Sequence, residues 1–158
     1  MACLAAKRPR DNGVMVADFK YTGTFSSGPL SPIRPKRKSR LNPPEVERGA
    51  EFTISYFFRC TAPVDEDWLV FIHGDGPQGG AHRVFGDHAP LGGLYPTSEW
   101  KVGDLVQDDY QMTVPSNYPY ESFTLWMGLW KGNQRLSVAQ RYAHDGDNRV
   151  RTAFVRVR

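Results

Sequence analysis

The sequence predicts an all-β protein, a two-sheet immunoglobulin-like antiparallel β-sandwich with long loops, and three observations predict it. Aromatic residues make up 13% of the 158 residues, beside 15 glycines and 12 prolines, which favours strands joined by turns over helices. Apolar and polar residues alternate in several stretches that turn-forming segments separate. We find no helical periodicity over ten residues. The chain is long enough for one domain with a hydrophobic core.

The first third of the chain predicts a tether, a strand and a long connection. We expect residues 1–13 to form a flexible N-terminal tether and residues 14–158 to form a single β-sandwich domain. Side chains alternate over 14–25, as in a strand. Residues 26–49 contain five prolines, and proline removes a backbone donor, so this segment is expected to be a surface connection with at most an edge strand.

Most of the remaining strands follow from period-two alternation. Residues 122–132 place Phe123, Leu125, Met127 and Leu129 on one face, and Trp126 and Trp130 on the other. Short antiparallel strands with turns between them predict two packed sheets. We expect seven or eight strands in all, and those that follow the connection are predicted at 51–60, 67–73, 104–115, 122–132, 134–140 and 149–158.

Residues 74–100 are predicted to be a long loop that is rich in histidine, aspartate and glycine. His73, His82 and His88 could ligate a transition metal, so a metal-dependent enzyme is one alternative. A rigid loop accounts for the same segment: Asp87 can accept backbone N–H bonds, His88 can fix the turn by hydrogen bonds, and Trp100 can fill the interior. We favour the rigid loop, and we expect no metal site and no cofactor.

No pattern predicts a catalytic site. Cys60, Thr97 and Ser98 lie outside any known nucleophile motif. Asp108 and Asp109 are neighbours on a predicted strand and point to opposite faces, whereas glycosidases need two carboxylates across a cleft. We expect one of the two at the surface and the other paired with an arginine. The chain is therefore predicted not to be an enzyme.

A basic segment at 33–40 offers a second binding surface. Its candidate residues, Lys36, Arg37, Lys38 and Arg40, could bind lipid phosphates or an acidic partner, or the segment could be a solvated loop. Nucleic acid is not an expected partner, because the net charge is only +3 and no aromatic residues alternate with the basic ones.

The two cysteines predict different environments. Cys60 closes an apolar alternation and is expected to be a buried free thiol. Cys3 is a lipidation candidate: as the first residue of a mature lipoprotein it would anchor the tether in a membrane. This predicts an extracytoplasmic protein, in the periplasm or at the outer membrane. The alternative is that Cys3 is an ordinary residue of a cytoplasmic protein.

Residues 45–158 carry a spaced motif set that resembles a known module. The motifs fall on Gly49, Val70 to His73, Asp87, His88, Pro90, Gly93, Pro96, Thr97, Trp100, Gly103, Asp108 or Asp109, Gly128, Leu129, Arg135 and Leu136. They resemble the extracytoplasmic β-sandwich domain of bacterial mannosyltransferase-like glycosyltransferases of the dolichyl-phosphate-mannose type, and its free-standing secreted or lipoprotein relatives. The chain departs from that pattern at "YPYES", where a glycine is usual. The catalytic membrane part is absent, so the resemblance implies the fold and an extracytoplasmic place but no transferase activity.

Together these observations predict a non-enzymatic binding or structural module that recognises an envelope protein or glycan. A carbohydrate-binding module is the nearest alternative, because aromatic side chains on one sheet face can stack on a sugar ring. The predicted binding residues outside the basic segment are Trp126, Trp130, Asp87, His88 and Tyr95.

Overall fold

The computed structural model describes residues 14–22, 45–138 and 145–158, which contain nine strands and two 3-10 turns. The strands form two sheets, confirming an all-β architecture. The elements are β1 (Val14–Thr22), β2 (Glu45–Val46), β3 (Glu51–Cys60), β4 (Leu69–Gly76), β5 (Gly79–Phe85), η1 (Pro90–Gly93), η2 (Thr97–Glu99), β6 (Leu105–Thr113), β7 (Ser122–Lys131), β8 (Gln134–Arg135) and β9 (Val150–Val157).

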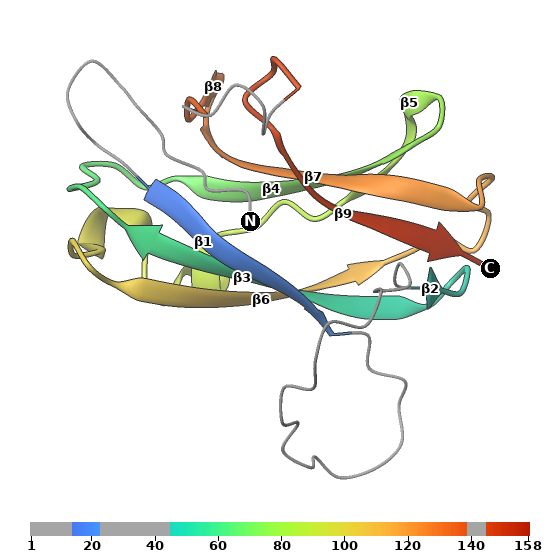
Figure 1. Cartoon of the computed structure of the whole chain (residues 1–158), viewed down its shortest axis with the longest axis horizontal. Helices are drawn as coiled ribbons and strands as arrows, with labels where there is room; N and C mark the ends of the chain where they lie inside the picture. The colour runs from blue at the N-terminus through green and yellow to red at the C-terminus, as the bar shows by residue number, and fades with distance from the viewer. Residues whose placement is uncertain (1–13, 23–44, 139–144) are drawn as a thin grey trace, which may run out of the picture.

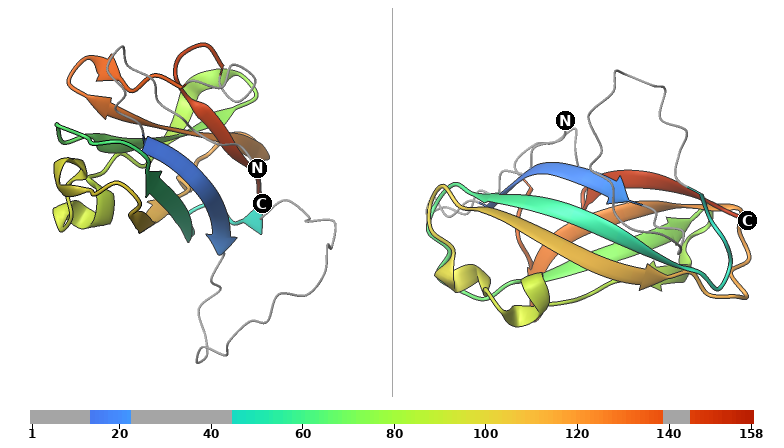
Figure 2. Two further views of the ribbon diagram at one scale, coloured as in Figure 1. Left: turned by 60° about the vertical axis from the view of Figure 1, so that its left-hand side comes forward. Right: turned by 90° about the horizontal axis from the view of Figure 1, so that it is seen from below.

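The two sheets lie face to face as layers (Figure 1). Sheet A has the order β1-β3-β6 and is antiparallel throughout. Sheet B has the order β2-β9-β7-β4-β5, with β8 paired to β7, and only its β2–β9 pair is parallel. Seen from below, the strands of sheet A lie in front of those of sheet B (Figure 2).

The core lies between the sheets and follows the predicted alternation. In β3 the residues Phe52, Ile54, Tyr56, Phe58 and Cys60 are buried. In β7 the inward residues Phe123, Leu125, Met127 and Leu129 are also buried, and they join the same hydrophobic cluster. Burial of each large apolar side chain contributes about 1.5–3 kcal/mol, so these two strands supply much of the energy that holds the sheets together.

The last strand changes phase partway along. Leu125 pairs with Ala153 and Trp126 pairs with Arg151, so β9 has one extra residue between these pairs, a β-bulge. Ala153, Val155 and Val157 alternate with polar residues in the sequence, which predicts one inward face. Val155 and Val157 do point inward, but before the bulge the buried residues are Val150 and Thr152. Ala153 is only partly buried because the bulge shifts the register.

The prediction that residues 74–100 form one long loop is partly wrong. Residues 79–85 form β5, which makes a hairpin with β4 and is the edge strand of sheet B. Residues 79–82, the first two of them glycines, are all exposed, so no apolar face marks this strand in the sequence. The predicted strand at 134–140 is also shorter, since β8 covers only Gln134–Arg135. Within the described ranges neither 3-10 turn approaches the length or apolarity that a membrane-crossing helix needs.

Candidate functional site

The loop after β5 is held by a partly buried histidine and a buried carboxylate. His88 Nδ1 lies 2.8 Å from the Gly86 carbonyl oxygen, and Nε2 lies 2.8 Å from Asp108 Oδ2. Asp108 Oδ1 also accepts the Leu91 backbone N–H, and the His88 ring stacks on Tyr110 at 3.8 Å between centroids. His88 therefore fixes the loop to β6, as the rigid-loop interpretation predicts. The prediction that one of the two aspartates pairs with an arginine is wrong, because the ion-pair partner of the buried Asp108 is His88.

The rest of this loop is anchored by its own hydrogen bonds. Thr97 is fully buried, donates to the Glu66 carbonyl oxygen and accepts the Trp68 backbone N–H. Trp100 is buried as predicted, and its indole N–H donates to the Tyr95 carbonyl oxygen. The Tyr95 hydroxyl donates to Asp104. Tyr95 lines a shallow pocket of about 370 Å³ at the start of β6.

The three histidines of the metal alternative lie in different surroundings. His73 packs against Phe71 and Phe85, and His82 packs against Tyr120. His88 faces Asp108. Among residues 45–138 and 145–158, no three His, Cys, Asp or Glu side chains come together as metal ligands. The structure thus gives no support to a metal centre built from these histidines.

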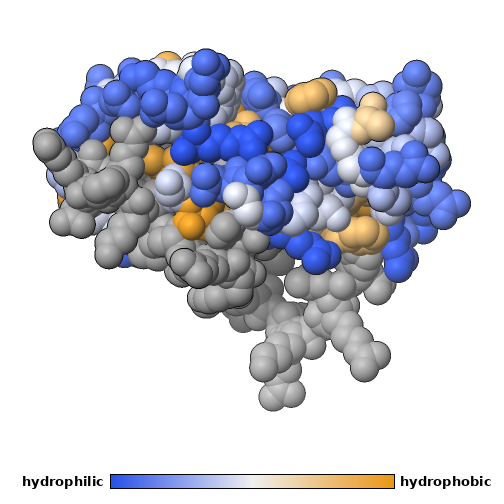
Figure 3. All heavy atoms as spheres, turned by 90° about the horizontal axis from the view of Figure 1, so that it is seen from above, coloured by the Kyte–Doolittle hydropathy of each residue, from blue (hydrophilic) through white to orange (hydrophobic). Residues whose placement is uncertain are grey.

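The outer face of sheet B carries a larger pocket of about 510 Å³. This face is mainly hydrophilic, with small hydrophobic patches (Figure 3). The pocket lies over β4 and β7, and two turns, one between β7 and β8 and one before β9, complete it. We call it the outer pocket, and its lining residues are Phe71, His73, Trp130, Gly132, Asn133, Gln134, Arg135, Gly146, Asp147 and Asn148.

Phe71 forms the floor of the outer pocket because its neighbour in the sheet is a glycine. Phe71 pairs with Gly128 across β4 and β7. A Cβ atom at Gly128 would lie 2.5 Å from the Phe71 ring and 2.9 Å from the Asn148 carbonyl oxygen. Only glycine lets the ring lie flat at this point of the sheet.

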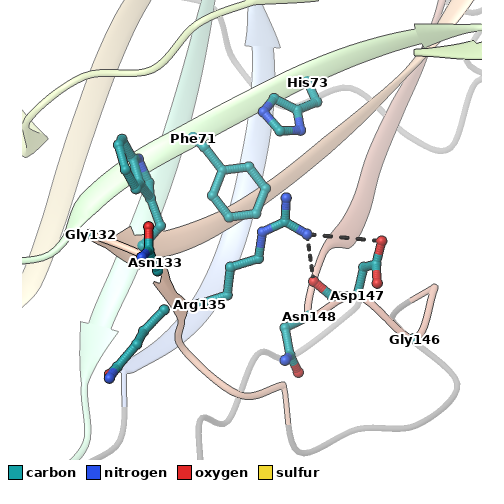
Figure 4. A pocket seen from close by; sticks show the side chains of 10 residues that line it. Phe71, His73, Gly132, Asn133, Arg135, Gly146, Asp147 and Asn148 are labelled. Atoms are coloured by element: carbon teal, nitrogen blue, oxygen red, sulfur yellow. Dashed lines mark hydrogen bonds and ion pairs between the residues drawn. The ribbon is translucent and has the colours of Figure 1, made fainter.

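Arg135 extends over this floor toward the turn before β9 (Figure 4). Its guanidinium carbon lies 4.9 Å from the centroid of the Phe71 ring, a cation–π contact. Nη1 donates to the Asp147 carbonyl oxygen at 2.9 Å, while the Asp147 carboxylate is 4.0 Å away and its side chain is 75% exposed. The guanidinium thus faces the pocket, and the carboxylate faces water.

Two polar atoms in the walls have no hydrogen-bond partner among the described residues. They are the ring nitrogen Nδ1 of His73 and the indole nitrogen Nε1 of Trp130, and both are buried. His73 Nε2 is 3.8 Å from Asp87 Oδ1, too far for a hydrogen bond. An unpaired buried polar group costs about 1–3 kcal/mol, so proteins rarely leave one without a reason.

The electrostatics of the wall keep His73 neutral. Burial, assisted by the positive charge of Arg83, lowers the pKa of His73 to about 4. Burial also raises the pKa of Asp87. At neutral pH the imidazole therefore has one donor and one acceptor nitrogen and carries no charge.

A charged network adjoins the pocket on the His73 side. Asp75 accepts hydrogen bonds from Arg83 and Arg149, and Arg149 also pairs with Asp145. Although burial raises the pKa of Asp75, the two arginines outweigh it and the pKa is lowered. The Arg149 guanidinium lies 5.1 Å above the Trp126 ring. This network is satisfied within the protein, and it covers one face of Trp126.

The predicted binding residues therefore separate. Trp130 lines the outer pocket, Asp87 lies beside its wall, and Trp126 lies on the same sheet face but does not line the pocket. His88 and Tyr95 belong to the loop around η1 and η2. The candidates Lys36, Arg37, Lys38, Arg40 and Cys3 lie outside the described residues, whereas Cys60 is a buried free thiol as predicted.

Sequence reasoning missed the pocket residues Phe71, Arg135 and Asp147. Phe71 is hidden in a continuous apolar run, and Arg135 and Asp147 lie in or beside the short turns at 131–133 and 145–148, which carry no functional motif. The available signal was the Gly, Asn and Asp content of these two turns, which adjoin because β7 and β9 pair as antiparallel neighbours.

Comparisons with known proteins provide no relative. The chain matches no known family and no curated protein. The resemblance to the glycosyltransferase-associated module thus stays a prediction.

His73 provides a test of the wall's electrostatics. Its lowered pKa of about 4 means that the unfolded chain binds a proton between pH 6.5 and 4 that the folded protein does not. The free energy of unfolding should therefore fall by about 1–2 kcal/mol from pH 7 to pH 5 through this residue. We expect His73→Phe to remove that fall in urea denaturation, and His82→Gln to retain it. An unchanged fall in His73→Phe would show that His73 is not its source.

Proposed function

We propose that this chain is a non-catalytic binding module and that the outer pocket binds a saccharide. The observation that carries the proposal is the composition of the pocket: aromatic side chains and two unpartnered buried nitrogens stand beside amide, carboxylate and guanidinium groups. Its volume of about 510 Å³ falls in the range of small-ligand sites, about 300–1,000 Å³.

The chemistry of a sugar fits this combination. A sugar ring presents apolar C–H groups on its faces and hydroxyls around its edge. Trp130 offers an aromatic surface for such a face. Asn133, Asn148 and Asp147 offer donors and acceptors at the ends of two turns, where hydroxyls can bind. A purely apolar ligand would leave these polar groups desolvated and unpaired.

We also propose that the fold is an immunoglobulin-like sandwich. In that fold the strands named A, B and E share one sheet, and C, F and G share the other. The strands β1, β3 and β6 would be A, B and E, while β4, β7 and β9 would be C, F and G, and the orders of the two sheets agree with this assignment. The pocket would then lie over strands C and F. Binding sites built from the loops and outer faces of a rigid scaffold are common in such folds.

Binding rather than catalysis is proposed because the reactive groups lie elsewhere. The Cys60 thiol is buried in the core, and burial raises its pKa, which disfavours the thiolate. Thr97 spends its hydroxyl on backbone partners. An extracytoplasmic place and a lipid on Cys3 stay predictions from the sequence, and the mass of the N-terminal peptide from native material tests the lipid.

Binding to an array of bacterial envelope polysaccharides and their oligosaccharides tests the proposal. For the best binder, Trp130→Ala should weaken affinity at least tenfold, because its ring forms a wall of the pocket. Asn133→Ala, in the exposed turn, should weaken it several-fold. Trp126→Ala is the matched control, because Trp126 is also a tryptophan on the outer face of sheet B but does not line the pocket. This variant should change the affinity less than twofold.

Two results would contradict the proposal. One is an array on which no saccharide binds the folded protein. The other is a saccharide whose affinity is the same for Trp130→Ala and the parent protein. Circular dichroism of each variant establishes that it is folded before its binding is compared.

A further inference from the structure

We infer that the saccharide bound in the outer pocket carries an anionic group, a carboxylate, sulfate or phosphate, which Arg135 holds. This inference rests on the proposed function and specifies its ligand. It comes from a comparison of the hydrogen-bond donors and acceptors that the pocket leaves unused.

The unused groups are mostly donors. Arg135 uses Nη1 toward the Asp147 carbonyl oxygen, and its Nε and Nη2 have no partner among the described residues. The Trp130 indole nitrogen can only donate, and it too is unpaired. Asn148 accepts the Val138 backbone N–H through Oδ1, which leaves its amide N–H groups to donate. The Trp130 nitrogen is enclosed in the wall, so the donors that a ligand can reach are those of Arg135 and Asn148, and a ligand that pairs with them must offer acceptors.

The position of the charges favours an anion over a neutral acceptor. The Arg135 guanidinium lies over the buried Phe71 ring, and its side chain is 36% exposed, so solvent screens its charge only in part. The opposing Asp147 carboxylate is 75% exposed, so solvent screens it. His73, with a pKa of about 4, adds no charge at neutral pH. Arg149 and Arg83 are neutralised by Asp75 and Asp145.

Arg135 is also free to meet such a group. Among the described residues its guanidinium makes one backbone hydrogen bond, the contact with the Phe71 ring and one contact at 4.0 Å with an exposed carboxylate. A guanidinium forms two parallel hydrogen bonds with a planar carboxylate, and charge-assisted bonds are about twice as strong as neutral ones. An anionic saccharide would therefore complete the coordination of Arg135, with its ring against the aromatic wall.

The test compares one saccharide with and without its charge. Isothermal titration would measure the binding of trigalacturonate and of its fully methyl-esterified form, which has the same rings and no charge. Sulfated and phosphorylated disaccharides, each beside its uncharged parent, distinguish the three sources of the anion. We expect at least one charged form to bind tenfold or more tightly than its neutral counterpart, with an affinity that falls as salt is added.

Variants locate the charge. Arg135→Gln should lower the affinity for the charged ligand at least tenfold and the affinity for the neutral ligand less than twofold. Asp147→Asn should raise the affinity for the charged ligand about twofold, since it removes the negative charge that opposes Arg135. Arg151→Gln is the matched control, because Arg151 is exposed on the neighbouring strand β9 outside the pocket, and it should have little effect.

The outcomes separate the inference from the function it rests on. If a charged saccharide and its neutral counterpart bind with equal affinity, and binding still depends on Trp130, the pocket binds a saccharide but does not select an anionic group. If no saccharide of either kind binds, the proposed function fails and this inference fails with it. If Arg151→Gln weakens binding as much as Arg135→Gln, the anionic group is not bound specifically by Arg135 in this pocket.

Discussion

Replacing Asp108 by alanine should lower the free energy of unfolding by about 3–5 kcal/mol, as the loss of one partner of a buried pair usually does. Asp108 is 1% exposed and serves two groups, the His88 ring and the Leu91 backbone N–H. Without it both lose an acceptor in a part-buried site that water reaches only in part. Folded domains are stable by about 5–15 kcal/mol, so this single change should cost a large share of the total.

Asp109→Ala is the control, because Asp109 is the next residue on the same strand and is exposed. Its effect should stay within about 0.5 kcal/mol. Urea denaturation at pH 7 measures both variants. A loss below about 1 kcal/mol in Asp108→Ala would show that the pair does not hold the loop to β6.

Asp108→Asn separates the charge from the shape of this site. A neutral imidazole donates from one nitrogen only, and both nitrogens of His88 face acceptors, the Gly86 carbonyl oxygen and the Asp108 carboxylate. An asparagine at 108 can turn its amide toward His88 and donate to it. We expect a smaller loss of unfolding free energy than in Asp108→Ala, together with a change in the hydrogen bonding of the His88 ring nitrogens that nitrogen NMR detects.

The strands that could be predicted are those with one buried and one exposed face. In β3 and β7 every second residue enters the core, so the sequence carries the period directly. β5 carries no such signal, because it is a glycine-rich edge strand whose first four residues are exposed. The alternation of β9 misleads at Ala153, since a bulge is a property of two paired strands and does not show in one.

The site was harder to predict than the fold because its residues are distant in sequence. Phe71 and Arg135 meet only through the pairing of β4 with β7 and of β7 with β8. Trp130 was found since its large ring interrupts the polar face of a predicted strand. His88 has the opposite lesson: a histidine in a glycine-rich loop suggested binding, but its two ring nitrogens face the Gly86 carbonyl oxygen and the Asp108 carboxylate.

Gly128→Val should disrupt both the fold and the outer pocket. The added Cβ would meet the Phe71 ring on one side and the Asn148 carbonyl oxygen on the other, at 2.5 and 2.9 Å. The ring can turn away, but the backbone oxygen can move only if the turn before β9 moves with it. Overpacking of this kind costs about 1–3 kcal/mol or more, and valine should reach the upper end. Urea denaturation measures the loss.

The same change should weaken saccharide binding at least tenfold in whatever fraction stays folded, because Phe71 and Asn148 both line the pocket. Gly79→Asn is the control, since a Cβ there meets nothing within 4 Å and asparagine tolerates the positive φ of 76°. It should retain binding and lose less than about 1 kcal/mol. Phe71→Leu in the Gly128→Val background should restore part of the stability and none of the binding. Because it relieves only the contact with the ring, a full recovery of stability would mean that the Asn148 carbonyl oxygen does not constrain residue 128.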